Sequence, residues 1–204
     1  MHLYLFGGTG PGNFSTQRDL IFSIIKNKNP KQLLLVPFAS GRDSYVSLSK
    51  KQLTSTFPSI ELLRADNENH IARAVKPLTF VLGGRDHKGL FQSIVSNKRL
   101  ESIIRNCENY IGESAGAMIA GTLQRASSEL PESPLMKGLG LLPDTIIEPH
   151  YTERNRHTLL REEMKIGRVK YGIGIDEASG IHIDLSNYRH TWEKIGEGEV
   201  SLIH

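Results

Sequence analysis

Residues 109–121 read Asn-Tyr-Ile-Gly-Glu-Ser-Ala-Gly-Ala-Met-Ile-Ala-Gly, a strand-like run that passes through Gly-Glu-Ser-Ala-Gly into a helix start of small residues. This order predicts a sharp strand-to-helix turn with Ser114 at its tip, because Gly112 and Gly116 remove side chains that would clash there. A serine at the head of a helix meets free backbone amides and the positive end of the helix dipole. The pattern alone could merely turn a corner, but its place between strand and helix favours a nucleophile.

Short apolar runs alternate with longer amphipathic segments through the first half of the chain. Repeated strand, helix, strand predicts a mostly parallel sheet with helices on both faces, the α/β class. The predicted strands are 3–6, 33–38, 60–63, 79–82 and 110–111, and the predicted helices are 16–26, 44–57, 67–75 and 88–105. Ligands of such sheets bind beyond the carboxyl ends of the strands, so the loops after these strands should converge on one rim.

The second half of the chain has a different pattern. Residues 124–140 carry prolines and glycines, which favours a long surface excursion. A strand over 145–148, a helix over 153–166 and short strands over 170–175, 180–185 and 199–203 are expected after it. The sequence shows no internal repeat and no linker, so we expect residues 1–204 to form a single domain.

Composition limits the class of protein. Hydrophobic residues make up 38% of the 204 residues and charged residues 23%. The sequence has no long apolar run of the kind that spans a membrane. The formal charge of +3 is spread over scattered Lys and Arg, which does not favour nucleic acid as a partner. Cys107 is the single cysteine and cannot form an internal disulfide. The start of the chain has no basic leader, so a cytoplasmic location is expected.

Two glycine-rich segments follow predicted strands. Residues 7–12 read Gly-Gly-Thr-Gly-Pro-Gly, which fits the dinucleotide fingerprint poorly because Pro11 lacks the amide that a phosphate would need. We expect a flexible loop at the rim instead. At Gly83 and Gly84 the backbone can approach a reacting carbonyl closely, so the Gly84 amide could bind an oxyanion together with the Ala115 amide.

A serine nucleophile needs a base, and His150 is the best placed of the eight histidines. It follows the predicted strand 145–148 and therefore lies at a strand's carboxyl end, on the same rim as Ser114. An imidazole there can take the serine proton and return it to a leaving amine. The alternative is a histidine that only caps the following helix.

Three segments together resemble the dipeptidase E and cyanophycinase family of serine peptidases. They are Leu82-Gly83-Gly84, the run 112–117, and His150-Tyr151-x-x-Arg154-x-Arg156. The resemblance implies a three-layer α/β sandwich like class I glutamine amidotransferases, with a flavodoxin-like core and serine in place of cysteine. It further implies Ser114 as nucleophile, His150 as general base and an acidic residue after the serine, a place that Glu129 occupies. Glu129 could equally be an exposed loop carboxylate.

The resemblance also bears on the substrate. Cyanophycinases carry glutamine after Gly-Gly-x and a third arginine after the histidine segment, where this chain has Asp86 and Leu159, which argues against cyanophycin. Dipeptidase E relatives cleave dipeptides with an amino-terminal aspartate, and that carboxylate needs a cation. The candidate substrate-binding residues are Arg156, then Arg154 and Arg85, with Asp86 for a substrate ammonium and Tyr151 beside His150. Asp176 and Glu177 resemble a recurrent family segment that could support the site or merely cap a turn.

The sequence therefore predicts a serine hydrolase of small peptides that forms an acyl-enzyme through Ser114, His150 and an acid, without metal or cofactor. The expected partner is a small peptide, and a homodimer stays open. Two rivals remain: an amidotransferase-like amide hydrolase or acyl transferase, and a catalytically silent binding domain of the same fold. An ordinary α/β-hydrolase is disfavoured because His150 follows Ser114 too closely for the usual intervening strands.

Overall fold

The structure is a computed structural model that describes residues 1–41, 43–127, 133–186 and 192–204. Its strands form two sheets, and the larger one lies at the centre of the protein. This 7-stranded sheet has the order β11-β10-β1-β5-β4-β2-β3. Its strands are β1 (His2–Phe6), β2 (Gln32–Val36), β3 (Glu61–Arg64), β4 (Leu78–Val81), β5 (Asn109–Glu113), β10 (Gly180–Asp184) and β11 (Trp192–Ile195). The strands from β1 to β3 in this order run parallel, whereas β10 and β11 extend the sheet in antiparallel fashion.

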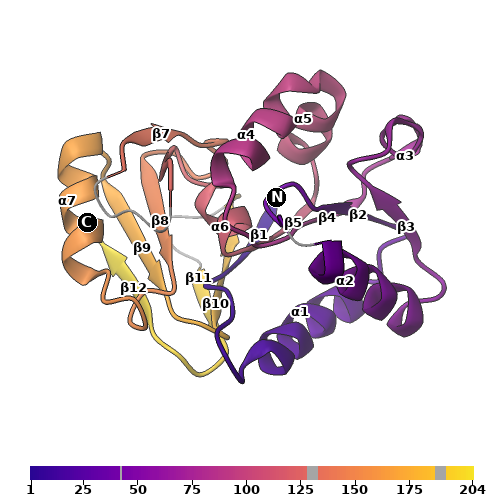
Figure 1. Ribbon diagram of the computed structural model, residues 1–204, viewed down its shortest axis with the longest axis horizontal. Helices are drawn as coiled ribbons and strands as arrows, with labels where there is room; N and C mark the ends of the chain where they lie inside the picture. Colours follow the sequence, from indigo (N-terminus) through magenta and orange to yellow (C-terminus); the bar gives the residue numbers. More distant parts are fainter. Residues whose placement is uncertain (42, 128–132, 187–191) are drawn as a thin grey trace.

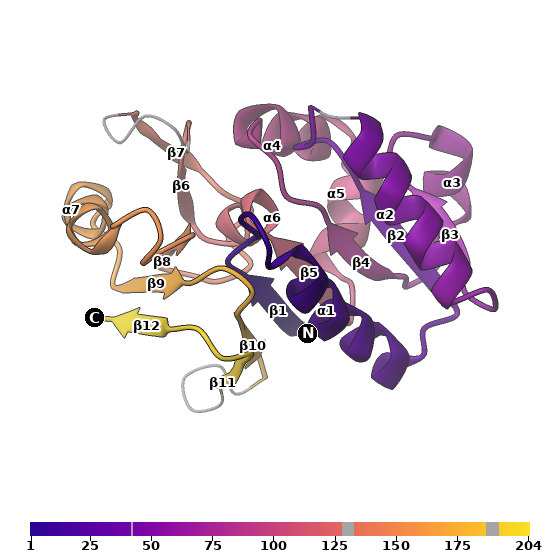
Figure 2. The same cartoon turned by 60° about the horizontal axis from the view of Figure 1, so that its bottom comes forward.

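A 5-stranded sheet of order β12-β9-β8-β6-β7 lies beside the first (Figure 2). Its strands are β6 (Leu123–Arg125), β7 (Leu135–Lys137), β8 (Thr145–Pro149), β9 (Tyr171–Ile175) and β12 (Val200–Ile203). The central pair, β8 and β9, is parallel, so both strands end on the same edge of this sheet. Figure 2 shows α6 (Ala115–Met118) where the two sheets approach each other.

Helices cover both faces of the larger sheet, as Figure 1 shows. On one side lie α1 (Phe14–Lys28) and α2 (Asp43–Thr56), and on the other α4 (His87–Ser96) and α5 (Lys98–Arg105). The short helix α3 (Glu68–Arg73) follows β3, and α7 (His157–Gly167) packs on the second sheet. This three-layer arrangement confirms the predicted α/β fold class.

The alternation of side chains along the parallel strands explains the layers. In β1, Leu3 and Leu5 belong to the hydrophobic core under α4 and α5, whereas Tyr4 and Phe6 belong to the core under α1 and α2. Successive side chains of a strand point to opposite faces, so a strand that is apolar at every position needs cover on both sides. Leu3, Leu5 and Phe6 are 0% exposed, as a sheet covered on both faces requires.

The structure differs from the predicted elements in four places. The helix expected over 88–105 is two helices, because Asn97 interrupts it and its side chain accepts a hydrogen bond from the Leu100 amide as a new cap. The helix expected from residue 153 begins at His157, after a run of turns. The predicted excursion over 124–140 contains the paired strands β6 and β7, and β11 was not expected.

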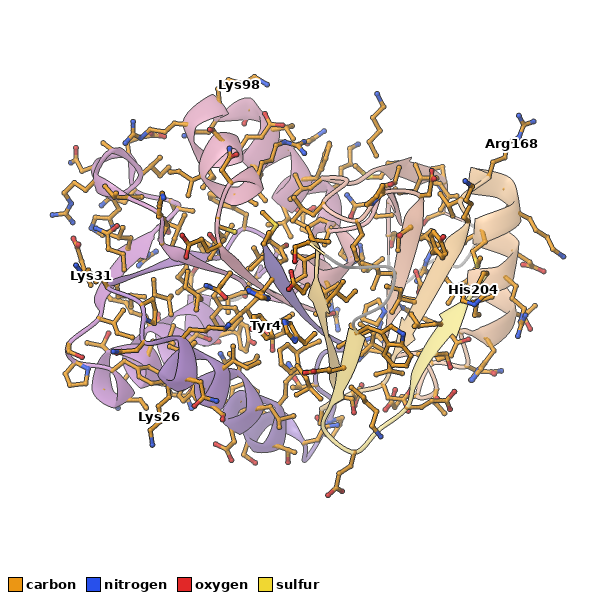
Figure 3. The ribbon with its side chains drawn as sticks, turned by 180° about the vertical axis from the view of Figure 1, so that it is seen from behind. Tyr4, Lys26, Lys31, Lys98, Arg168 and His204 are labelled. Atoms are coloured by element: carbon orange, nitrogen blue, oxygen red, sulfur yellow. The ribbon has the colours of Figure 1, made fainter. Side chains whose placement is uncertain are left out.

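Figure 3 shows the distribution of labelled side chains. Lys26, Lys31, Lys98 and Arg168 lie at separate points of the periphery and point outward, whereas Tyr4 lies within the body of the molecule. These four positive charges are therefore dispersed. Among the helices that the structure describes, none has the length and apolar character needed to cross a membrane.

Candidate functional site

Ser114 lies at the tip of the predicted turn, between β5 and α6. Its backbone has φ 49° and ψ −105°, a conformation that residues other than glycine seldom adopt. The surrounding backbone holds it there, since the Ser114 amide donates to the Phe6 carbonyl at 2.9 Å and the Ser114 carbonyl accepts from the Ala117 amide at 2.9 Å. A strained turn of this kind lifts the hydroxyl out of the sheet, and Ser114 stays partly exposed.

His150 meets this hydroxyl. Its Nε2 lies 3.1 Å from Ser114 Oγ, within hydrogen-bond reach. The residue directly follows β8, and its amide donates to the Gly7 carbonyl at 3.0 Å, which ties the end of β8 to the end of β1. His150 is 6% exposed, so its imidazole is almost fully buried and its Nε2 faces the serine hydroxyl.

Glu177 supplies the third group. Its Oε1 lies 2.7 Å from His150 Nδ1. The two residues come together because β8 and β9 are parallel and in register, with Pro149 opposite Ile175, so the chain leaves both strands at the same edge. Glu129, predicted for this place, lies outside the described residues, and the Nδ1 position that it would need is occupied by Glu177.

The glycine-rich loop after β1 lies at the rim, as expected, and contacts both His150 and Glu177. Gly8 has φ +96°, and a Cβ at this position would lie 2.6 Å from His150 Nε2. Further along the loop, Asn13 Nδ2 donates to Glu177 Oε2 at 3.0 Å, and Asn13 Oδ1 accepts from the Gly10 amide at 2.7 Å. The loop therefore packs on the histidine and also orients the carboxylate.

The electrostatics of the site keep the imidazole neutral. Burial, followed by the positive charge of Arg154, lowers the pKa of His150 to about 4, while its hydrogen bond and charge interaction with Glu177 oppose that shift. A neutral imidazole whose Nδ1–H donates to Glu177 has a free acceptor at Nε2, directed at Ser114 Oγ. This is the tautomer that a general base requires.

Sequence reasoning named the backbone amides of Ala115 and Gly84 as candidate oxyanion donors. Ala115 is the first residue of α6, and Gly84 lies in the loop after β4. In the described part of the chain, neither amide has a hydrogen-bond acceptor. Amides at such positions are available to a developing negative charge on a carbonyl oxygen.

Two predicted substrate residues are buried instead. Arg156 is 3% exposed, and its Nη1 donates to Glu148 Oε2 and to the Pro149 carbonyl, both at 2.9 Å. Tyr151 is 1% exposed and packs against the ring of His157 at 4.3 Å between centroids. Arg156 and Tyr151, both predicted to bind the substrate, are thus buried and engaged with groups of the protein itself.

The remaining predicted substrate residues are exposed. Asp86 caps α4, since its Oδ1 accepts from the Gly89 amide at 2.7 Å, which gives it a local structural role. Arg85 precedes it in the same loop. Arg154 lies in the turn after β8, where its amide donates to the His150 carbonyl at 3.1 Å. Of the predicted cations, Arg154 is thus exposed and close enough to influence His150 electrostatically.

Sequence reasoning missed a buried cluster of charges behind His150. Arg125 Nε and Nη2 contact the carboxylate of Glu148 at 3.1 and 2.5 Å, and Arg125 Nε also lies 2.7 Å from Glu163 Oε1. Burial, with the negative charge of Glu148, raises the pKa of Glu163 to about 8. A carboxylate at the end of the apolar run 145–148 was the one signal in the sequence, since a charge on a buried strand needs partners.

We expect the pKa of His150 to be measurable as a marker of this environment. The imidazole resonances of His150, assigned through His150→Gln and followed by NMR as pH is lowered, should titrate near pH 4. Arg154→Gln should move that titration to higher pH, because it removes a positive charge that disfavours the imidazolium. Titration near the ordinary value of about 6.5 in the wild-type protein would contradict the described burial.

The charge cluster should matter for stability. Glu148→Ala leaves Arg125 and Arg156 buried without this shared carboxylate, and breaking such a buried pair typically costs about 3–5 kcal/mol of the free energy of unfolding. The matched control is Glu162→Ala, an exposed glutamate of α7, for which a change within about 0.5 kcal/mol is expected. Urea unfolding followed by circular dichroism measures both, and equal effects would refute the structural role of Glu148.

Comparison with known proteins places this chain in a family. The model of peptidase family S51 matches residues 3–190. A cyanophycinase of Synechococcus elongatus is 33% identical over 98 residues, covering 45% of this chain and 30% of the relative. That of Geminocystis herdmanii is 33% identical over 98 residues, covering 45% and 35%. The matched region thus spans about a third of these relatives' length. Because the family model covers nearly all of the sequence, the chain belongs to peptidase family S51.

Proposed function

We propose that this protein is a serine peptidase that cleaves small peptides through an acyl-enzyme, with Ser114 as nucleophile, His150 as general base and Glu177 as the acid that orients the base. The observation that carries the proposal is one continuous set of contacts, Ser114 Oγ to His150 Nε2 at 3.1 Å and His150 Nδ1 to Glu177 Oε1 at 2.7 Å. Nucleophile, base and orienting group in this order form the hydrolytic triad.

The steps follow from these contacts. His150 takes the proton of Ser114 as the hydroxyl oxygen attacks the peptide carbonyl, and it returns the proton to the departing amine. The Ala115 and Gly84 amides bind the oxyanion of the tetrahedral intermediate. A water molecule, deprotonated by His150, then hydrolyses the ester on Ser114, and the proton returns to the serine as the acid product leaves.

Glu177 has two tasks in this scheme. It holds the Nδ1–H tautomer of His150, and its negative charge stabilises the imidazolium that forms when the serine proton is taken. Three further hydrogen bonds fix its position: Asn13 donates to its carboxylate, its amide donates to Glu153 Oε1 at 3.0 Å, and the neighbouring Ala178 amide donates to the Gly8 carbonyl at 2.9 Å. A residue whose backbone and carboxylate are both held by hydrogen bonds is suited to orient an imidazole.

For the substrate, we propose dipeptides with an amino-terminal aspartate. Arg154 supports this preference, since it is exposed, follows His150 by one turn of chain and bears a charge that acts on the imidazole. A substrate carboxylate beside the triad would pair with such a guanidinium. The curated relatives are named cyanophycinases, yet this chain has Asp86 and Leu159 where the family resemblance implies glutamine and arginine in cyanophycinases. Cytoplasmic location stays a prediction from the sequence, and a homodimer stays open.

The triad is tested by a pair of matched changes. Glu177→Gln should slow peptide cleavage by about 10⁴-fold, because an amide cannot hold the productive tautomer, while Glu129→Gln, the same change at the other predicted acid, should leave the rate near that of the wild type. Ser114→Ala should abolish cleavage and labelling by a fluorophosphonate probe. Release of amino acids, read by mass spectrometry, measures the rates.

Two outcomes would contradict this assignment. If Glu129→Gln is slow and Glu177→Gln is fast, then Glu129 is the acid and the contact of Glu177 with His150 is structural. If the wild-type protein releases ammonia from glutamine but cleaves no dipeptide, the amidotransferase-like alternative is correct. Glu162→Gln, at an exposed glutamate of α7, controls for a general effect of losing one charge.

The aspartyl preference is tested at Arg154. Arg154→Gln should lower kcat/KM for aspartyl dipeptides by about tenfold to a hundredfold, since a charge-assisted hydrogen bond is worth about 1.5–3 kcal/mol, and should spare neutral dipeptides. Arg161→Gln, an exposed arginine on α7, serves as the control. An equal loss for acidic and neutral substrates would mean that Arg154 does not bind the substrate carboxylate.

A further inference from the structure

The residue directly before the nucleophile is a buried carboxylate that the triad does not use. Glu113 is 2% exposed at the end of β5, on the face of the sheet that α1 and α2 cover. Its Oε1 accepts from Gln17 Nε2 at 2.7 Å, and its Oε2 accepts from Tyr45 Oη at 2.5 Å and from the Gly83 amide at 3.2 Å. One side chain thus joins α1, α2 and the loop after β4.

The bond to Gly83 reaches the proposed oxyanion site, because the next amide along the chain is that of Gly84. The loop has little room to move. A Cβ at Gly84 would lie 1.9 Å from the Ala39 carbonyl oxygen, and one at Gly83 would lie 3.2 Å from Ser114 Cβ. The loop is therefore packed between the segment after β2 and the nucleophile. Glu113 holds it there by accepting the hydrogen bond from the Gly83 amide.

A buried positive charge stands behind this carboxylate. Arg18 is 3% exposed, and its Nη2 donates to Tyr45 Oη at 2.9 Å, so the tyrosine hydroxyl connects Arg18 to Glu113. The guanidinium also lies 5.0 Å from the ring centroid of Phe14 and 5.6 Å from that of Phe80. Burial, then the negative charge of Glu113, raises the pKa of Tyr45. The tyrosine therefore stays protonated and donates a hydrogen bond to the carboxylate.

We infer that Glu113 and Tyr45 are positioning residues of the oxyanion site, which hold the Gly83–Gly84 loop at the distance from Ser114 that transition-state binding requires. The inference rests on the proposed function. The oxyanion donors of a hydrolase act only where they are preorganised, so a support that fixes one of them should affect the rate without touching the substrate. Arg18 balances the charge of Glu113, since a buried carboxylate without a counter-charge would disfavour an oxyanion nearby.

The experiment compares the rate at which a fluorophosphonate labels Ser114 in the wild type, Glu113→Ala, Glu113→Gln, Tyr45→Phe and, as control, Tyr171→Phe, a tyrosine of β9 outside these contacts. The phosphoryl oxygen occupies the oxyanion site during labelling. We expect a loss of about a hundredfold in Glu113→Ala and about tenfold in Tyr45→Phe, the scale set by removal of an oxyanion donor. Glu113→Gln should restore most of the rate, because its amide oxygen can accept from both Gly83 and Tyr45.

Two further readouts separate positioning from general loosening. The labelling rate falls at low pH as His150 becomes protonated. The apparent pKa of this fall should equal that of the wild type in every variant. Hydrogen exchange of the Gly83 amide should be slow in the wild type and in Glu113→Gln and faster in Glu113→Ala. Tyr45→Phe retains the Gly83 bond and keeps the inference testable if Glu113→Ala does not fold.

The outcomes are distinct. Equal labelling of the wild type, Glu113→Ala and Tyr45→Phe would overturn this inference and leave the proposed function intact. So would a shift in the apparent pKa of the fall at low pH, or a Glu113→Gln protein as slow as Glu113→Ala. A wild-type protein that never labels at Ser114 would overturn the proposed function and the catalytic meaning of Glu113 together.

Discussion

The junction between the two sheets, at Gly7 and Gly8, is the constraint on which the site depends. The Gly7 carbonyl accepts from the His150 amide and the Gly8 carbonyl accepts from the Ala178 amide, so β1 of the large sheet is joined to the ends of β8 and β9 of the small one. Gly8 adopts a positive φ and lies against the imidazole, where a side chain would collide with it. These contacts bring Ser114 of one sheet within reach of His150 and Glu177 of the other.

Rigidity behind the site comes from two buried polar assemblies. On the side of the second sheet, Arg125, Glu148 and Arg156 hold the start of the turn that carries His150, since Arg156 bonds both Glu148 and the Pro149 carbonyl. On the side of α1 and α2, Glu113 and its partners hold the loop after β4. Buried charges tolerate little displacement, because each loses partners that water cannot replace. Both assemblies therefore favour one arrangement of the reacting groups.

Much of the fold was predictable because its signals are local. Alternating apolar strands and amphipathic helices indicated the layers, and the strand-like run before Gly112 indicated the turn at Ser114. His150 was found because it follows a strand, and the carboxyl ends of parallel strands meet at one edge. The split of the expected helix 88–105 at Asn97 was missed, since asparagine inside an amphipathic pattern reads as one weak helix residue until its side chain is seen to cap.

The sequence by itself determined the layered architecture and pointed to the proposed nucleophile and the proposed base, because each depends on residues adjacent in the chain or on a periodic pattern. Only the tertiary structure decided which carboxylate meets His150 and which arginine is open to solvent. Glu177 lies 27 residues after His150 and contacts it because of the register of β8 with β9. Arg156 is buried because it pairs with the buried carboxylate of Glu148. Neither spacing nor residue type encodes those pairings, since they arise from which strands become neighbours and from the need to neutralise each charge that folding removes from water.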